Sequence, residues 1–156
     1  MRAVLACFLF IFAVSCGPEN VPASEISFDR QRMEIVRKDG KSLPFSVEIA
    51  DTPEKQMRGL MYRTSMGPDE GMLFLYSRSK PVSMWMANTY ISLDMLFIDK
   101  AGTILQIEEH TQPLSKAVIS SFGPADAVLE LNAGTAERLG IKAGDTAVHP
   151  FFMVEK

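Results

Sequence analysis

Alternating apolar and polar positions early in the chain indicate β-structure. Phe45, Val47 and Ile49 are separated by single polar residues, so one face of a strand would enter a core and the other would meet water. Asp39-Gly40 divides this segment from an earlier apolar one. Asp-Gly between alternating segments is typical of a hairpin with a type I′ turn, because both residues tolerate a positive φ. The pattern predicts an antiparallel strand pair.

A short helix is predicted after this hairpin. Thr52 is a candidate N-cap and Pro53 suits the first helical position. Gly59 costs about 1 kcal/mol inside a helix, so it marks the helix end or a close contact. The apolar stripe of this helix consists of Met57, Leu60 and Met61.

The remaining chain reads as further strands and one more short helix. We expect the second helix at 132–140, with Asn132 as its cap and Gly140 as its end. Many strands at short spacing with two short helices are typical of a mainly β, compact single domain, a β-sandwich or a barrel-like fold. The expected strands cover 72–76, 84–88, 91–99, 103–109 and 127–131, with a kink near 88–90 and a surface loop at 110–126.

The N-terminus has the layout of a bacterial secretory signal. One basic residue precedes an apolar run from Ala3 to Val14, which is shorter than the roughly 20 residues that span a bilayer. The sequence AVSCG resembles a lipoprotein box, in which Cys16 is lipidated. We therefore expect a signal peptide at 1–15, a tether at 16–27 and one β-rich domain at 28–156.

Two alternatives to lipidation stay open at the N-terminus. The signal could be cleaved conventionally near Ser15 or after Ser24, or it could remain as an uncleaved anchor. All three interpretations export the domain. The expected location is the periplasmic side of a bacterial membrane, with the domain held there by lipid on Cys16.

Cysteine count and charge narrow the function classes. Cleavage after Ser15 removes Cys7 and leaves 156 − 15 = 141 residues with Cys16 alone. The mature domain would have no disulfide, thiol nucleophile or cysteine metal cluster. Loss of Arg2 gives a formal charge of 15 − 19 = −4, and mild acidity argues against nucleic acid as a partner.

The stretch SMWMANTYISLDMLFID carries the most prominent polar residues. Asp94 shares a strand face with Leu96 and Ile98, and a buried carboxylate needs donors or a raised pKa. In one hypothesis, Asp94 and Asn88 only tie the kinked strand to backbone N–H groups. In the other, a shallow pocket recognises an anion through Arg63. The candidate ligand-binding residues are Arg63, Trp85, Asn88, Thr89 and Asp94.

Chemistry at Asp94 and metal binding are weaker alternatives. Asp94 could serve an envelope hydrolase, but no second acid in its block is placed to work with it. The sequence contains no HExxH, GxSxG or Gly-rich phosphate loop. Six methionines could offer thioethers to Cu(I), although core packing is their commoner role. These are Met57, Met61, Met66, Met72, Met84 and Met86. No catalytic residue, metal ligand or cofactor is assigned.

Five ordered blocks resemble the family catalogued as domain of unknown function 192. They are GLMYR at 59–63, GMLF at 71–74, MWMANTYISLDMLFID at 84–99, PADAVLEL at 124–131 and AGTAERLGIKAGD at 133–145. The resemblance implies a compact, mainly β domain that is often exported in bacteria and archaea, and it implies no established activity. Asn132 departs from the family pattern, which has proline there.

The leading interpretation is an exported, lipid-anchored β-domain without catalysis. It would bind a small ligand or a cell-envelope protein, and contact the membrane through its N-terminal lipid. The alternatives are an envelope hydrolase that uses Asp94 and a methionine-rich copper-binding protein.

Overall fold

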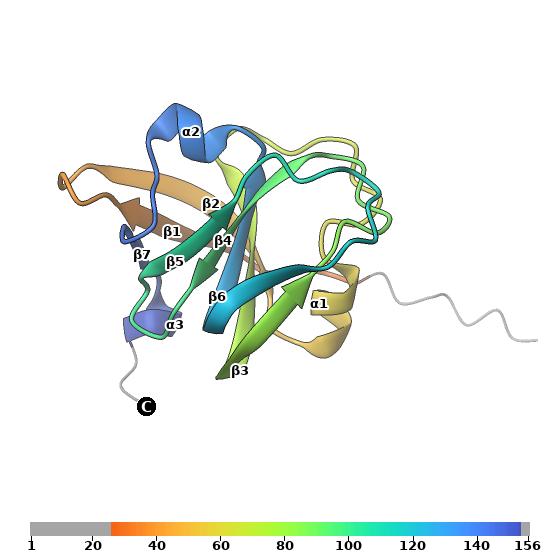
Figure 1. Cartoon of the computed structure of the whole chain (residues 1–156), viewed down its shortest axis with the longest axis horizontal. Helices are drawn as coiled ribbons and strands as arrows, with labels where there is room; N and C mark the ends of the chain where they lie inside the picture. Colours follow the sequence, from red (N-terminus) through yellow and green to blue (C-terminus); the bar gives the residue numbers. More distant parts are fainter. Residues whose placement is uncertain (1–25, 154–156) are drawn as a thin grey trace, which may run out of the picture.

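One seven-stranded sheet organises residues 26–153, which are the residues described by the computed structural model (Figure 1). Its strand order is β5-β4-β6-β3-β2-β1-β7, and β2 and β3 form the parallel pair in an otherwise antiparallel arrangement. The strands are β1 Arg30–Val36, β2 Ser42–Ala50, β3 Glu70–Met84, β4 Leu93–Ile98, β5 Ile104–Glu108, β6 Ile119–Asn132 and β7 Thr146–Val148. The helices are α1 Pro53–Arg58, α2 Thr135–Leu139 and α3 Pro150–Met153. The expected signal peptide and most of the tether lie outside the described residues.

The sheet curls until its outer strands meet, so the barrel-like alternative is the correct one. Thr103, just before β5, bridges Thr146 at the start of β7. The Ala147 N–H donates to the Gly102 carbonyl at 2.7 Å, and the Ile104 N–H donates to the Asp145 carbonyl at 2.9 Å. Gly102 has a φ of 84°, and a Cβ there would collide with the carbonyl oxygen of Ala147. The seam therefore needs glycine at this position.

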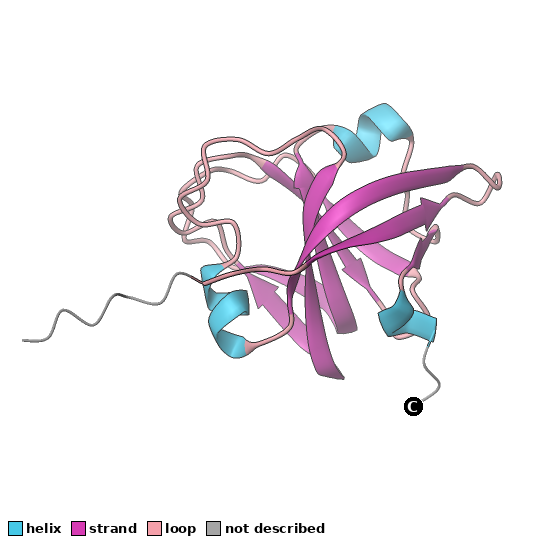
Figure 2. Ribbon diagram, turned by 180° about the vertical axis from the view of Figure 1, so that it is seen from behind, coloured by secondary structure: helices cyan, strands magenta, loops and turns pink. Residues whose placement is uncertain are grey.

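Apolar side chains fill both faces of the central strands. All six residues of β4 are buried. Leu96 and Ile98 join a cluster with residues of β1 and β2, while Met95 and Phe97 join a second cluster with residues of β3. Successive side chains of a strand point to opposite faces, so β4 is covered on both sides. Figure 2 shows α1 at the end of the sheet where the long loops gather.

The β1–β2 hairpin forms where it was predicted, with a different turn. Gly40 has a φ of 84°, whereas Asp39 is not among the residues with positive φ. The Gly40 N–H donates to the Arg37 carbonyl, and the Arg37 N–H donates to the Lys41 carbonyl. This is a type I turn followed by a glycine bulge, not the expected type I′ turn.

Capping and terminating residues in the sequence correctly predicted α1 and the end of α2, but not the start of α2. The Thr52 side chain accepts from the Lys55 N–H, and Gly59 ends α1. Gly140 ends α2 with a φ of 67°. Asn132 is not the cap of α2, because it ends β6 and its side chain donates to the carbonyls of 66 and 67. A third helix, α3, was not expected.

Two strands are longer than the hydrophobic pattern indicated. β3 continues through the polar segment 77–80 to Met84, with a register shift between Leu75 and Lys80. β6 begins at Ile119, inside the segment expected to be a surface loop. These two extensions pair with each other, so long-range pairing overrides their weak local pattern. Residues 85–92 form a loop, and the strand expected at 84–88 was wrong.

Asp94 fastens β4 to two other parts of the fold. Its side chain is fully buried. One carboxylate oxygen accepts from the His110 N–H at 3.0 Å and from the Gly134 N–H at 3.1 Å, and the other accepts from the Ala136 N–H at 2.9 Å. The loop after β5 and the first turn of α2 are thereby held at the start of β4. The donors are backbone groups, not Arg63 or Trp85.

Asp94→Ala is expected to lower the free energy of unfolding by about 3 kcal/mol, because one buried and two partly buried N–H groups lose their acceptor. Urea denaturation measures this loss. Asp99→Ala is the matched control: Asp99 accepts two backbone N–H bonds in a less buried turn and should cost about 1 kcal/mol. Equal losses in the two variants would contradict the fastening role of Asp94.

Candidate functional site

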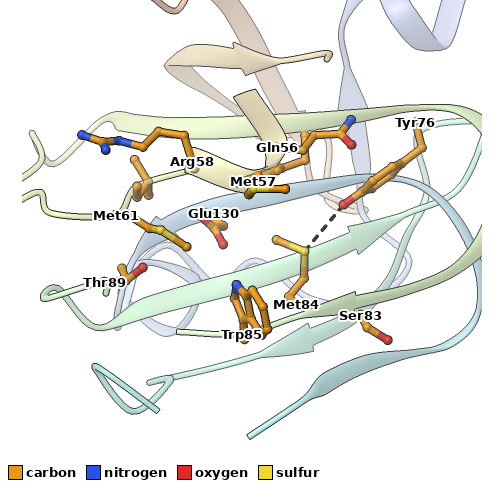
Figure 3. A pocket seen from close by; sticks show the side chains of 13 residues that line it. Gln56, Met57, Arg58, Met61, Tyr76, Ser83, Met84, Trp85, Thr89 and Glu130 are labelled. Carbon is orange, nitrogen blue, oxygen red and sulfur yellow. Dashed lines mark hydrogen bonds between the residues drawn. The ribbon is translucent and has the colours of Figure 1, made fainter. Parts of the chain in front are cut away.

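A cavity of about 290 Å³ lies beneath α1 (Figure 3). The roof is α1 with the turn that follows it, and the floor comes from β3 and β6. The loop after β3 supplies one wall. The lining residues are Gln56, Met57, Arg58, Gly59, Leu60, Met61, Phe74, Tyr76, Ser83, Met84, Trp85, Thr89 and Glu130.

Glu130 is the buried acid of this cavity. It lies on β6 between Met72 of β3 and Met95 of β4 in the register of the sheet, and only 4% of the residue is exposed. Its carboxyl group points into the cavity (Figure 3). Its side chain has no hydrogen-bond partner among residues 26–153, and its oxygens are open to the cavity, since no enclosed polar side-chain atom in this range lacks a partner. Burial raises the pKa of Glu130 to about 8, so at neutral pH the group is mainly protonated and able to donate a hydrogen bond.

Aromatic and thioether groups surround this acid. Trp85 is about half exposed and stands at the mouth, while Tyr76 is buried deeper. The Tyr76 hydroxyl lies 3.6 Å from the Met84 sulfur. Burial, and secondarily the proximity of Glu130, raises the pKa of Tyr76, so its phenol stays protonated. The cavity thus combines apolar groups with the polar side chains of Gln56, Arg58, Tyr76, Ser83, Thr89 and Glu130.

The structure separates the five predicted ligand-binding residues. Trp85 and Thr89 line the cavity. Asn88 lies beside it with a φ of 59°, and its carbonyl accepts from the Tyr62 N–H at 2.8 Å. Asp94 is enclosed elsewhere by its three backbone donors.

Arg63 is also not part of the cavity lining. Its guanidinium makes a two-pronged ion pair with Glu48 of β2. Both residues line a different depression, together with the first described residues Ile26, Ser27 and Phe28. Arg63 and Asp94 therefore do not form one anion pocket with Trp85.

The six candidate copper-binding methionines also lie in different places. Met57, Met61 and Met84 line the cavity, whereas Met72 and Met86 are fully buried core residues and Met66 packs against the same cluster. His149 shares a hydrogen bond with Gln31 at 2.9 Å. Within residues 26–153, no group of three or more histidine, cysteine or acidic side chains is arranged to hold a metal ion.

Sequence reasoning missed Glu130. The residue sits in AVLEL, where its apolar neighbours Leu129 and Leu131 suggest an ordinary strand with one wet face. The strand is instead buried on both faces. The available signal was a lone acid inside an apolar run, which becomes informative once both faces are known to be covered.

Glu130 should make stability fall as pH rises. The folded pKa of about 8 exceeds the ordinary value of 4.5, so the folded state holds a proton that the unfolded state releases. The free energy of unfolding therefore drops between these two pH values, by up to about 1.4 kcal/mol per pH unit. Glu130→Gln removes this slope, which urea denaturation at a series of pH values measures.

A control is needed because His149 titrates in the same window with the opposite sign. Burial lowers the pKa of His149, so its contribution to stability rises with pH. The difference between wild type and Glu130→Gln isolates the glutamate, and the exposed Glu109 provides a matched Glu109→Gln variant that should keep the wild-type slope. A slope unchanged by Glu130→Gln would overturn the assignment.

Two solved structures resemble this chain. One, from Sinorhizobium meliloti 1021, is described as a "putative transcription regulator"; it is 47% identical, with a TM-score of 0.77, over 79% of this chain and 95% of that one. The other, a protein of unknown function from Novosphingobium aromaticivorans DSM 12444, is 35% identical, with a TM-score of 0.74, over 82% of this chain and 89% of that one. Among curated proteins, none matches.

The family comparison agrees with the five sequence blocks. The model of the DUF192 family, described as an uncharacterized ACR, matches residues 34–149. This range holds all seven strands except the first residues of β1, and every residue of the cavity lining. The chain therefore belongs to the DUF192 family.

Proposed function

We propose that this chain is an exported binding protein whose cavity beneath α1 takes one small, largely apolar molecule with an amine or hydroxyl group. The observation that carries the proposal is Glu130: a nearly fully buried residue at the floor of a cavity, whose carboxyl group has no hydrogen-bond partner in the described part of the chain. Its oxygens are open to the cavity, because no enclosed polar side-chain atom of residues 26–153 lacks a partner. A ligand in the cavity would therefore supply the hydrogen-bond partner that the domain does not.

The chemistry around Glu130 favours an amine or a hydroxyl over an anion. A protonated amine would pair with the carboxylate form of Glu130 and lie against the face of Trp85, and a cation is attracted to an aromatic face. A hydroxyl would exchange hydrogen bonds with the neutral form of Glu130. A carboxylate ligand would meet a second acid at Glu130, which is unfavourable, and the guanidinium of Arg58, the cation of the lining, points away from Glu130 (Figure 3).

The size of the cavity supports an organic molecule over a single metal ion. About 290 Å³ is close to the lower end of the 300–1,000 Å³ that is usual for small-molecule pockets. Met57, Met61 and Met84 could bind Cu(I) through their sulfurs, but the Met57 side chain is largely exposed. The copper alternative has less support than an organic ligand.

Asp94 is not placed to act as the general base that the hydrolase alternative requires. A general base must reach the proton that it abstracts, and Asp94 is fully buried with both oxygens bonded to backbone N–H groups. Binding without catalysis therefore stays the leading function.

Export and lipid anchoring are supported by the sequence pattern alone. The apolar run before Cys16 and the absence of any other cysteine after it fit an exported lipoprotein, and the described domain needs no disulfide. Within residues 26–153, no helix is long and apolar enough to cross a membrane.

A ligand series tests the binding proposal. The full chain is titrated with hexylamine, hexanol and hexanoate while the fluorescence of Trp85, the only tryptophan in the sequence, is followed. We expect the order of affinity to be amine, alcohol, carboxylate. In Glu130→Gln the amine should bind about 10-fold to 100-fold more weakly, because a hydrogen bond to a charged group contributes about 1.5–3 kcal/mol, while hexanol keeps its affinity.

Glu109→Gln is the matched control for this titration, since Glu109 is an exposed acid outside the cavity lining. It should bind all three probes as the wild type does. Equal hexylamine affinity in the two variants, or no binding of any probe, would refute the proposal.

Mass spectrometry of the mature protein tests the anchor. We expect a chain that begins at Cys16 and carries the mass of attached acyl groups, and Cys16→Ala should release the domain from the membrane fraction. A mature protein with an intact Met1 would contradict both lipidation and simple cleavage.

A further inference from the structure

We propose that the end of the domain that carries the cavity mouth docks on the surface of an anionic lipid bilayer. Three segments meet at this end, 57–66, 84–92 and 111–118, and they are called the docking loops below. The Tyr62 N–H donates to the Asn88 carbonyl at 2.8 Å, and the Leu114 N–H donates to the Thr89 carbonyl at 3.1 Å. The loops lie side by side in both ribbon views (Figures 1 and 2).

The docking loops present large apolar side chains to solvent. The rings of Tyr62 and Tyr90 touch edge to face, with centroids 6.1 Å apart, and Trp85 stands at the cavity mouth. Tryptophan and tyrosine are enriched where membranes meet water, because their rings are apolar at one end and polar at the other. The exposed side chains of this surface are Met57, Tyr62, Trp85, Tyr90, Leu114 and Val118.

Two of these exposed residues have a backbone in the unfavourable left-handed region. Tyr62 has a φ of 66° and Leu114 a φ of 62°. Residues other than glycine in the left-handed region cost of order 1 kcal/mol or more, and such strain gathers at functional positions. Leu114 is 56% exposed, so packing inside the domain covers only part of its side chain, and a contact outside the domain would cover the rest.

The charge of the docking loops suits an anionic surface. They contain Arg58, Arg63 and Lys116 and no acidic residue, in a chain whose formal charge is −3. The rest of the chain therefore carries −3 − 3 = −6. Arg63 is paired with Glu48, which leaves Arg58 and Lys116 to meet lipid phosphates. Each basic residue near an anionic leaflet contributes about 1 kcal/mol of attraction.

The chain also enters the domain at this end. Ile26, the first described residue, lines a depression with Arg63, and Phe28 packs against the cluster beside the cavity. Cys16 precedes Ile26 by ten residues, which reach at most about 36 Å when extended. The proposed lipid on Cys16 would therefore keep this end close to the bilayer. Only the contribution of this lipid rests on the proposed export. A cavity that opens toward lipid would take an amphiphilic ligand from the membrane.

Depth-dependent fluorescence quenching tests the docking. The full chain is bound to vesicles of phosphatidylethanolamine and phosphatidylglycerol with brominated acyl chains, with no small ligand present. Trp85 emission should shift to shorter wavelength and be quenched by the bromines. Leu114→Asn, which tolerates a positive φ, should reduce this quenching. Lys116→Gln should weaken docking about fivefold on these vesicles and leave it unchanged on phosphatidylcholine.

Phe122→Asn is the control, because Phe122 is the most exposed of the large apolar residues described, at 92%, and lies outside the docking loops. It should leave the quenching of Trp85 at the wild-type level. The proposal is overturned if Trp85 in vesicle-bound protein stays open to aqueous iodide and is not quenched by the bromines. That result would leave the N-terminal segment as the sole membrane contact, and would not bear on binding in the cavity.

Discussion

The hydrogen bonds of the buried Asp94 carboxylate are the interactions on which the loop after β5 and the start of α2 depend. Its three backbone donors belong to the loop after β5 and to the start of α2. The Thr111 N–H in that loop then bonds to the Leu93 carbonyl, and the loop reaches Thr89 through Leu114. One acceptor thus fixes the loop after β5, which in turn is bonded at Thr89 to the loop that walls the cavity, because a buried carboxylate is stable only where its donors are held in place.

Glu130 is the counterpart of Asp94 on the opposite face of the sheet. Both are acids within runs of strand that are buried on both faces. Asp94 has its donors within the domain, whereas Glu130 faces a cavity and has no bonded partner among the described residues. Burial without donors keeps the pKa of Glu130 near 8. The two acids therefore differ in where a hydrogen-bond partner must come from, which is the domain for Asp94 and the cavity for Glu130.

Local physics made part of this structure predictable. Thr52-Pro53 and Gly59 bounded α1, and Gly40 located the first hairpin, because capping and positive φ depend on adjacent residues only. The extension of β3, the early start of β6 and the partners of Asp94 depend on residues far apart in sequence. Arg63 and Asp94 could not be separated from Trp85 by spacing alone, and Glu130 could not be recognised before both faces of β6 were known to be covered.

The two acids also connect the cavity with the exposed loops around it. Glu130 faces the cavity, and Trp85 stands at its mouth. A surface that covered Trp85 would reduce the access of water to the cavity, and loss of water favours the neutral form of a carboxyl group. An amine entering from the same side would have the opposite effect, because it stabilises the carboxylate. Covering the mouth and filling the cavity would therefore both change the protonation of Glu130, in opposite directions. Both events would take place beside the loops that Asp94 holds in place.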